Sequence, residues 1–335
     1  MALKHVPMIQ RQAAPPPGHP QGTLAWGGRD GVRPGADVMW SKNARGLADH
    51  QPRVDQGNSA FWNELCGSGT AKALGVHDRS SESLRKFDQW YFAFYSYLER
   101  YIPINDLAGK DVLEVGLGYG TIASALMKEG ARYHGLDIAE GPVEMARYRA
   151  ELKGCEADIR QGSILACPFA DHSFDHVVSI GCLHHTGDLA LAIGEVHRVL
   201  KPGGSATIMV YNALSYRQWL LRPWLALRLA LSFDDQRPPL HIAEAKALDI
   251  NQDGKPAPET AFVTKRQLRF LSQAFETIEI RQDHIHAELL FKKIPRAVAL
   301  KLFGPWLGLN LYARLRKRRS AASGEAHQED FGRTS

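Results

Sequence analysis

The feature that most constrains the fold is a run of three alternating glycines, Gly116, Gly118 and Gly120, directly after the mainly apolar segment 111–115. Glycine allows positive φ angles and lets the backbone come close to a ligand. A helix is expected from about Thr121, and the first turn of a helix offers N–H groups that have no partner within the helix. The segment therefore predicts a strand–loop–helix unit that binds a nucleotide-like ligand, and a tight turn without a ligand is the alternative.

The segments on either side of this loop alternate between strand and helix patterns. We expect helices at 121–129, 143–152 and 189–200, and strands at 111–116, 133–137, 159–162, 174–180 and 205–211. Such alternation is typical of a parallel sheet with helices on both faces.

The flanking regions divide the chain further. The Pro- and Gly-rich residues 1–55 and the polar residues 320–335 are expected to be disordered. Helices at about 60–75 and 82–101 predict a cap over 56–105, before a core at 106–211. An insertion is expected at 212–262, followed by a helix at 265–275, a strand at 277–285, a partly helical stretch at 294–307 and a last strand at 309–315.

The net positive charge of the chain comes from one short segment near its C-terminus. The net charge of +5 comes from 41 Lys and Arg against 36 Asp and Glu. Five cations lie within 314–319, so the rest of the chain is formally neutral and does not favour nucleic-acid binding. No run of eighteen apolar residues predicts a membrane span, and no apolar segment follows Met1 as in a signal peptide. We therefore expect a cytoplasmic protein in which the four cysteines, Cys66, Cys155, Cys167 and Cys182, are reduced.

Asp137 is expected at the end of the second strand, 21 residues after Gly116. A carboxylate at that position can accept hydrogen bonds from both ribose hydroxyls of a nucleoside. The next residue, Ile138, can cover one face of an adenine ring. An exposed aspartate that merely ends the strand is the alternative.

Three further blocks follow, and together with the glycine loop they identify a family. They are Gln161-Gly162-Ser163-Ile164, the segment 179–188 with Gly181, Cys182, His184 and His185, and Arg198-Val199-Leu200-Lys201-Pro202-Gly203-Gly204. The spacing of the glycines differs from the GxGxxG of dinucleotide-binding loops. Over residues 110–211 the chain resembles class I S-adenosylmethionine-dependent methyltransferases of the small-molecule type, similar to quinone-biosynthesis enzymes.

The resemblance implies a Rossmann-like, seven-stranded, mostly parallel sheet with an antiparallel last strand, and S-adenosyl-L-methionine as the cofactor. It places Glu114 near the methionine amino group and the three glycines of the loop along the methionine and ribose. The position of Ser163 meets the adenine amino group, and many relatives carry Asp there. The implied cofactor-binding residues are Glu114, Gly116, Gly118, Gly120, Asp137, Ile138, Ser163, Ile164, Gly181 and Cys182. Nothing in the sequence calls for a metal.

His184 and His185 follow the fourth strand, where a base is needed if an oxygen or nitrogen atom is methylated. They are our candidate catalytic residues. A structural role, with an imidazole that caps a helix or packs against the cofactor, is the other interpretation.

The acceptor is expected to be a small molecule or a glycan or lipid intermediate. The aromatic residues Trp90, Tyr91, Phe92 and Tyr95 either form a lid or pack their helix on the sheet. Segment 214–233 places arginines opposite Trp219 and Trp224, which fits a cap, a core helix or a helix on a membrane surface. The basic run 314–319 either assists contact with an anionic membrane or ends the last strand in solvent. A cofactor-binding pseudoenzyme or a membrane-surface interaction protein remains the alternative function, and the sequence does not indicate an oligomeric state.

Overall fold

The structure is a computed structural model that describes residues 44–65, 71, 74–76, 78–232, 240–241, 249, 256–286 and 294–319. Apart from Ala44 and Arg45, these residues belong to one compact unit, Gly46–Ser335. The predicted disorder of residues 1–43 and 320–335 lies outside the described residues.

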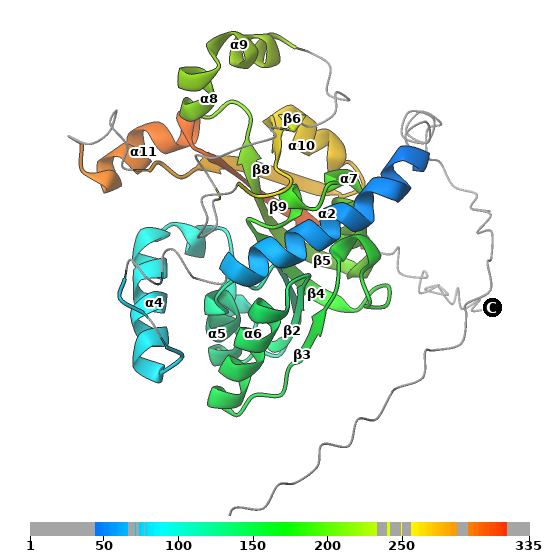
Figure 1. Ribbon diagram of the computed structural model, residues 1–335, viewed down its shortest axis with the longest axis vertical. Helices are drawn as coiled ribbons and strands as arrows, with labels where there is room; N and C mark the ends of the chain where they lie inside the picture. Colours follow the sequence, from blue (N-terminus) through cyan, green and yellow to red (C-terminus); the bar gives the residue numbers. More distant parts are fainter. Residues whose placement is uncertain are drawn as a thin grey trace, which may run out of the picture. The chain divides into compact units, whose positions relative to one another are not determined.

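A single sheet forms the centre of this unit (Figure 1). Its parallel part has the order β3-β2-β1-β4-β5. These strands are β1 (Asp111–Val115), β2 (Arg132–Asp137), β3 (Asp158–Gln161), β4 (Phe174–Ile180) and β5 (Leu200–Asn212). On the other side of β5, the strand β9 (Asn310–Arg316) runs antiparallel, and β8 (Thr277–Asp283) pairs antiparallel with β9. The predicted α/β fold class with its mostly parallel sheet is confirmed.

Helices cover both faces of the sheet because the strands between them carry apolar side chains on both sides. On one face, α5 (Thr121–Lys128) and α6 (Glu140–Lys153) bury Ile122, Leu126 and Val143. On the other face, α7 (Leu189–Val199) and α10 (Lys265–Leu271) bury Ile193 and Leu268. Crossover helices of this kind bring the carboxyl ends of all parallel strands to one edge of the sheet, where ligands bind in open α/β folds.

The predicted number of seven strands is wrong for the described residues, which contain nine. The two additional strands, β6 (Leu240–His241) and β7 (Ala261–Val263), fall where the sequence predicted a helical insertion. β7 pairs in parallel with Tyr211 and Asn212 at the end of β5, and β6 pairs antiparallel with β7. Both strands are too short to show a period-2 pattern, so only their partner strand reveals them.

The N-terminal helices differ from the prediction. Helix α2 (Ala44–Leu65) replaces the predicted helix at 60–75 and includes residues 44–55, which were predicted to be disordered. It is anchored by tertiary contacts, because Gln51 Nε2 donates to Thr186 O at 2.8 Å and Asn58 Nδ2 donates to His185 O at 2.6 Å. Helix α4 (Ser81–Phe94) begins at the Ser80 cap and ends well before 101, with a separate turn of 3₁₀ helix at Leu98–Arg100.

Residues 214–231 form two short helices, α8 (Tyr216–Leu221) and α9 (Pro223–Leu231). Pro223 separates them, because proline has no N–H to continue the first helix and favours the start of the second. The arginines of 214–233 were predicted to lie on one side of a single helix, and the break at Pro223 divides them between two helices. Tyr216 of α8 belongs to the same hydrophobic cluster as Ala299 and Phe303 of α11 (Arg296–Leu307), so α8 and α11 share a small core.

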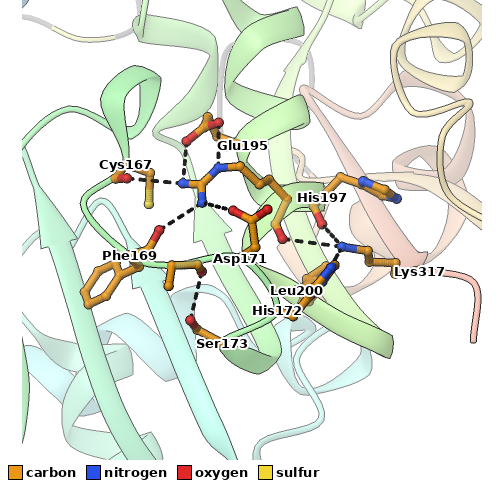
Figure 2. A network of polar contacts seen from close by, with 11 residues as sticks. Cys167, Phe169, Asp171, His172, Ser173, Glu195, His197, Leu200 and Lys317 are labelled. Carbon is orange, nitrogen blue, oxygen red and sulfur yellow. Dashed lines mark hydrogen bonds and ion pairs between the residues drawn. The ribbon is translucent and has the colours of Figure 1, made fainter. Parts of the chain in front are cut away.

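The basic run near the C-terminus is partly built into the fold (Figure 2). Lys317 is buried, and its Nζ donates to the carbonyl oxygens of His197 at 2.7 Å and Leu200 at 2.8 Å. These carbonyls lie at the end of α7, where a cation stabilises the unpaired groups. Beside it, Arg198 binds Glu195 and Asp171 and thereby ties α7 to the loop before β4.

Two further findings concern membrane spans and the cysteines. None of the helices in the described part of the chain is both long and apolar enough to cross a membrane. Cys155, Cys167 and Cys182 are free thiols, whereas Cys66 lies outside the described residues.

Candidate active site

A cavity of about 540 Å³ lies at the carboxyl ends of the parallel strands. This volume is in the range of small-molecule sites. Residues from the ends of β1, β2, β3, β4 and β5 line it, and α2 and α4 close it with Asn58, Trp62, Phe87, Tyr91 and Tyr95. All predicted cofactor-binding residues except Gly120 line this cavity.

The three glycines of the loop are glycine for two different reasons. All have positive φ angles, from 51° at Gly118 to 84° at Gly116. A Cβ on Gly116 would collide with Cys182, and a Cβ on Gly120 would lie 2.7 Å from Arg149 Cδ. A Cβ on Gly118 would meet nothing within 4 Å. The protein therefore leaves space at Gly118 that faces the cavity, while Gly116 and Gly120 allow the loop to pack.

Asp137 at the end of β2 is 8% exposed and fixes the glycine loop. Its Oδ2 accepts a hydrogen bond from Leu117 N at 2.7 Å, and its Oδ1 accepts one from Ala139 N at 2.9 Å. Each carboxylate oxygen has a further lone pair, so the group can still accept bonds from a ligand. Burial raises the pKa of Asp137 to about 6 even though these N–H groups favour the charged form.

Glu114 on β1 is a second buried carboxyl group at the cavity wall. Tyr133 Oη donates to its Oε2 at 2.6 Å. Burial nevertheless raises its pKa to about 8, and the nearby Asp137 adds to the shift. A ligand that brings positive charge or hydrogen-bond donors to these two carboxyl groups would lower the energy of their charged forms.

Ile138, Ser163 and Ile164, which were predicted to contact adenine, lie after β2 and β3, and all three residues line the cavity. Ser163 Oγ accepts a hydrogen bond from Leu165 N at 3.3 Å and caps a short 3₁₀ turn. Gly181 and Cys182 lie opposite, after β4, and also reach the cavity.

The two histidines of the 3₁₀ turn Leu183–His185 occupy different places. His184 is buried between the rings of His185 and Tyr211 and does not line the cavity. His185 lines the cavity, and its Nδ1 lies 2.6 Å from the carbonyl oxygen of Glu259. Since a carbonyl only accepts, Nδ1 carries a hydrogen, and Nε2 of the neutral ring has the lone pair. Burial lowers the pKa of both histidines, most strongly that of His184.

Several cavity residues were missed by the sequence analysis. Asp249 Oδ2 accepts a hydrogen bond from Tyr211 Oη at 2.8 Å and lies 3.5 Å from His185 Nε2. Asp55, Asn58 and Trp62 of α2 reach the same end of the cavity. They come from segments without a motif, so no local signal in the sequence could have indicated them. Tyr91 and Tyr95, which were considered for a lid, do line the cavity, whereas Trp90 and Phe92 do not.

The strand order, the glycine loop after β1 and the acidic residue that ends β2 together define a Rossmann-like domain that binds a nucleoside-containing cofactor. Comparison with known proteins specifies the class. Residues 113–208 match the model of the family described as methyltransferase domain. The middle of the chain is therefore a methyltransferase domain of the S-adenosylmethionine-dependent class.

The relatives found by sequence are similar over this domain alone. The chain is 38% identical over 109 residues to a ubiquinone biosynthesis O-methyltransferase of Pseudomonas paraeruginosa, which covers 32% of this chain and 46% of the relative. The same-named protein of Vibrio cholerae is 35% identical over 109 residues, with 32% of this chain and 44% of the relative covered. The matches thus span a little under half the length of these relatives.

Solved structures of similar topology include an S-adenosylmethionine-dependent methyltransferase from Mesorhizobium loti. It is 19% identical with a TM-score of 0.45, and the match covers 67% of this chain and 98% of the other. One from Methanosarcina mazei is 18% identical with a TM-score of 0.45, covering 68% and 99%. These TM-scores are too low to support the fold assignment, which rests on the strand order and the family match described above.

Proposed function

We propose that the whole protein transfers a methyl group from S-adenosylmethionine to a small-molecule acceptor. The observation that carries this proposal is the pair of buried carboxyl groups, Glu114 and Asp137, at the wall of a cavity whose glycine loop leaves room at Gly118. Both acids already accept hydrogen bonds from the protein and have further lone pairs. The methionine amino group and the ribose hydroxyls of this cofactor can donate to these lone pairs.

In this proposal each predicted residue has a place along the cofactor. Glu114 binds the methionine amino group, and Asp137 accepts from the ribose hydroxyls while it holds Leu117 in the loop. Ile138, Ser163 and Ile164 contact the adenine, and Gly181 and Cys182 face the methionyl end. Gly120 supports the loop from behind, where it packs on Arg149, and does not contact the cofactor.

The cofactor supplies a methyl group on a sulfonium, whose departing thioether needs no proton. The main task of the protein is then alignment of donor and acceptor in a site shielded from water. A proton on the acceptor must still be removed when oxygen or nitrogen is methylated. His185 is the better candidate for that task, because it lines the cavity as a neutral imidazole with Nε2 beside Asp249, whereas we assign His184 a structural role.

The acceptor itself is proposed to bind at the end of the cavity formed by α2, α4, His185 and Asp249. Trp62, Tyr91, Tyr95 and Tyr211 give this end aromatic walls. A glycan or lipid intermediate fits such walls as well as a free small molecule does. The test is incubation of the protein with labelled cofactor and fractions of bacterial metabolites and lipids. Transfer of label that is lost in Asp137→Ala supports the proposal. Cofactor binding without transfer to any fraction favours the pseudoenzyme instead.

A specific surface supports peripheral membrane contact as a second part of the proposal. Trp224 of α9 is 82% exposed and Trp306 of α11 is 79% exposed. Other large apolar side chains on α8, α9 and α11 are also exposed, namely Leu220, Leu221, Leu227, Leu231, Val298 and Leu302. These three helices contain Arg217, Arg228, Arg296 and Lys301 and not a single acidic residue. Tryptophan and basic residues beside an apolar face are typical of helices that bind anionic membranes.

This surface and the basic run 314–319 lie toward opposite ends of β5, as the pairing of β5 with β9 shows. Tyr211 pairs with Asn310 at the end of β5 that leads into α8, whereas Ser205 pairs with Arg316 near its start. We therefore propose that α8, α9 and α11 contact the membrane, and that 314–319 does not take part. Flotation with anionic vesicles tests this. Trp224→Ala with Trp306→Ala should abolish flotation, and Arg314→Ala with Arg316→Ala should leave it unchanged. The reverse pattern would move the contact to the strand end.

A further inference from the structure

The end of the cavity that remains for the acceptor has an unusual charge. Four carboxyl residues line the cavity, namely Asp55, Glu114, Asp137 and Asp249. Among the lining residues that the structure describes there is neither a lysine nor an arginine. In the proposed function Glu114 and Asp137 face the methionine amino group and the ribose hydroxyls of the cofactor. The other two acids stand at the acceptor end.

Asp55 and Asp249 are each linked to the segment His185–Thr186. Gln51 Nε2 donates to Asp55 Oδ1 and to Thr186 O, each at 2.8 Å. Asp249 lies 3.5 Å from His185 Nε2 and accepts a hydrogen bond from Tyr211 Oη at 2.8 Å. Each carboxyl group is thus held by a neighbouring side chain, and both line the same cavity.

Hydrogen-bond acceptors predominate at this end. Asn58 is 3% exposed, its Nδ2 is used by His185 O, and its Oδ1 has no hydrogen-bond partner. His185 Nε2 likewise has no hydrogen-bond partner and faces the carboxylate of Asp249, which accepts from Tyr211. Buried acceptors without donors are costly unless a ligand supplies the hydrogens. A hydroxyl brings one hydrogen, whereas an ammonium brings up to three and a positive charge.

The aromatic walls favour the same chemistry. Trp62 lies beside the His185 ring, with 4.8 Å between the ring centroids, and Tyr91, Tyr95 and Tyr211 line the same end. Aromatic faces attract cations by about 0.5–2 kcal/mol each, depending on desolvation. Carboxylates together with aromatic rings therefore recognise a cation better than a neutral alcohol and reject an anion.

We propose that the acceptor is an amine, bound as an ammonium between Asp55 and Asp249 and methylated on nitrogen. This inference rests on the proposed methyltransferase function and names its substrate class. The ammonium gives one proton through Asp249 to His185 Nε2, and the freed nitrogen lone pair then forms the new N–C bond. The S–C bond breaks with its electrons on sulfur, so the positive charge passes from the sulfonium to the methylated nitrogen, and the thioether leaves neutral.

The experiment uses the full chain loaded with S-adenosylhomocysteine and a panel of aralkyl and alkyl compounds. Each carbon skeleton is tested as its amine, its alcohol and its carboxylate by calorimetry, and methyl transfer is then measured with S-adenosylmethionine. The amines should bind at least about tenfold more tightly than their alcohols, which corresponds to about 1.4 kcal/mol. Asp55→Asn and Asp249→Asn should each remove most of this preference without a change in affinity for S-adenosylhomocysteine. Asp106→Asn, an exposed acid outside the cavity, is the matched control.

The possible failures are distinct. If no skeleton shows a preference for the amine, or if the preference survives in the Asp55→Asn, Asp249→Asn double variant, the amine proposal is wrong. Methylation of an alcohol or carboxylate with intact cofactor binding overturns the substrate class and leaves the proposed function standing. If the wild-type protein does not bind S-adenosylhomocysteine, the proposed methyltransferase function itself is wrong.

Discussion

The carboxylate of Asp88 on α4 holds the buried guanidinium of Arg149 on α6 through two hydrogen bonds, 2.8 Å from Nη1 and 3.0 Å from Nη2. The same carboxylate accepts from Thr121 Oγ1 at 2.7 Å, at the first residue after the glycine loop. Because Arg149 also packs on Gly120, one acid connects the helix that carries Phe87 and Tyr91 to the loop that we propose contacts the cofactor.

We therefore expect Asp88→Asn to reduce both stability and cofactor affinity. Removal of one partner leaves the Arg149 charge buried and uncompensated, which costs about 3–5 kcal/mol for fully buried pairs and less here because Asp88 is partly exposed. Chemical denaturation measures the stability change, and calorimetry with S-adenosylhomocysteine measures the affinity. Glu82→Gln, an exposed change on the same helix, serves as the control. An Asp88→Asn protein with wild-type stability and affinity would show that α4 is held by its apolar contacts alone.

Gly118→Ala should separate folding from cofactor binding. The φ angle of 51° strains any other residue by about 1–2 kcal/mol, but a Cβ there meets no protein atom. Gly109 offers a matched position, with a φ of 66° and no atom within 4 Å of a Cβ. Both alanine variants should lose a similar amount of stability, and Gly118→Ala alone should lose affinity for S-adenosylhomocysteine. Equal affinities in the two variants would mean that the cofactor does not pass over Gly118.

Glu114 should make the ligand-free protein less stable as the pH rises. Its pKa is raised from 4.5 to about 8 by burial, so the folded state binds more protons than the unfolded state between these values. The free energy of unfolding then falls with pH across this window, by at most about 1.4 kcal/mol per pH unit. Asp137, with a pKa raised to about 6, adds a slope of the same sign at lower pH. Between about pH 6.5 and 8 Glu114→Gln should therefore remove most of the slope, whereas the exposed Glu151→Gln should keep it. Denaturation midpoints over this range, without ligand, test the prediction, and an unchanged slope in Glu114→Gln would assign the effect to other groups.

His185 and His184 should respond differently to replacement by glutamine. If His185 takes up the acceptor proton, its neutral form is required, and single-turnover methylation should fall as the pH drops below about 6.5. Burial lowers the pKa of His185, and the negative charge of Asp249 partly opposes this shift. The methylation rate should therefore begin to fall at a pH below about 6.5. His185→Gln should lower the rate without a matching loss of cofactor affinity and should remove this acidic limb. His184→Gln should instead lower stability. Full rates in both variants would exclude a histidine base and leave alignment as the main contribution.

The parallel core could be predicted because its signals are local. The glycines after β1 and Asp137 at the end of β2 each act on neighbouring backbone, so their positions in the sequence fix the elements around them. Pro202-Gly203-Gly204 was expected to precede a strand that begins at 205, but it lies inside β5, where the pairing with β4 is irregular. The acceptor end could not be predicted in the same way. Asn58 and Asp249 are almost 200 residues apart and meet His185 only through tertiary contacts. The start of α2 was missed for a related reason, since its anchors lie at His185 and Thr186 and not in its own apolar pattern.

The most direct test of the account is calorimetric titration of the wild-type chain and of Asp137→Ala with S-adenosylhomocysteine and, separately, with NAD. The account predicts that the wild type binds S-adenosylhomocysteine and not NAD. Asp137→Ala should bind about 1–3 kcal/mol more weakly, because it loses hydrogen bonds to a charged group. Asp158→Asn, on the exposed side of β3, should bind as the wild type does. A wild-type protein that binds NAD and ignores S-adenosylhomocysteine would contradict the assignment of the site and everything inferred from it.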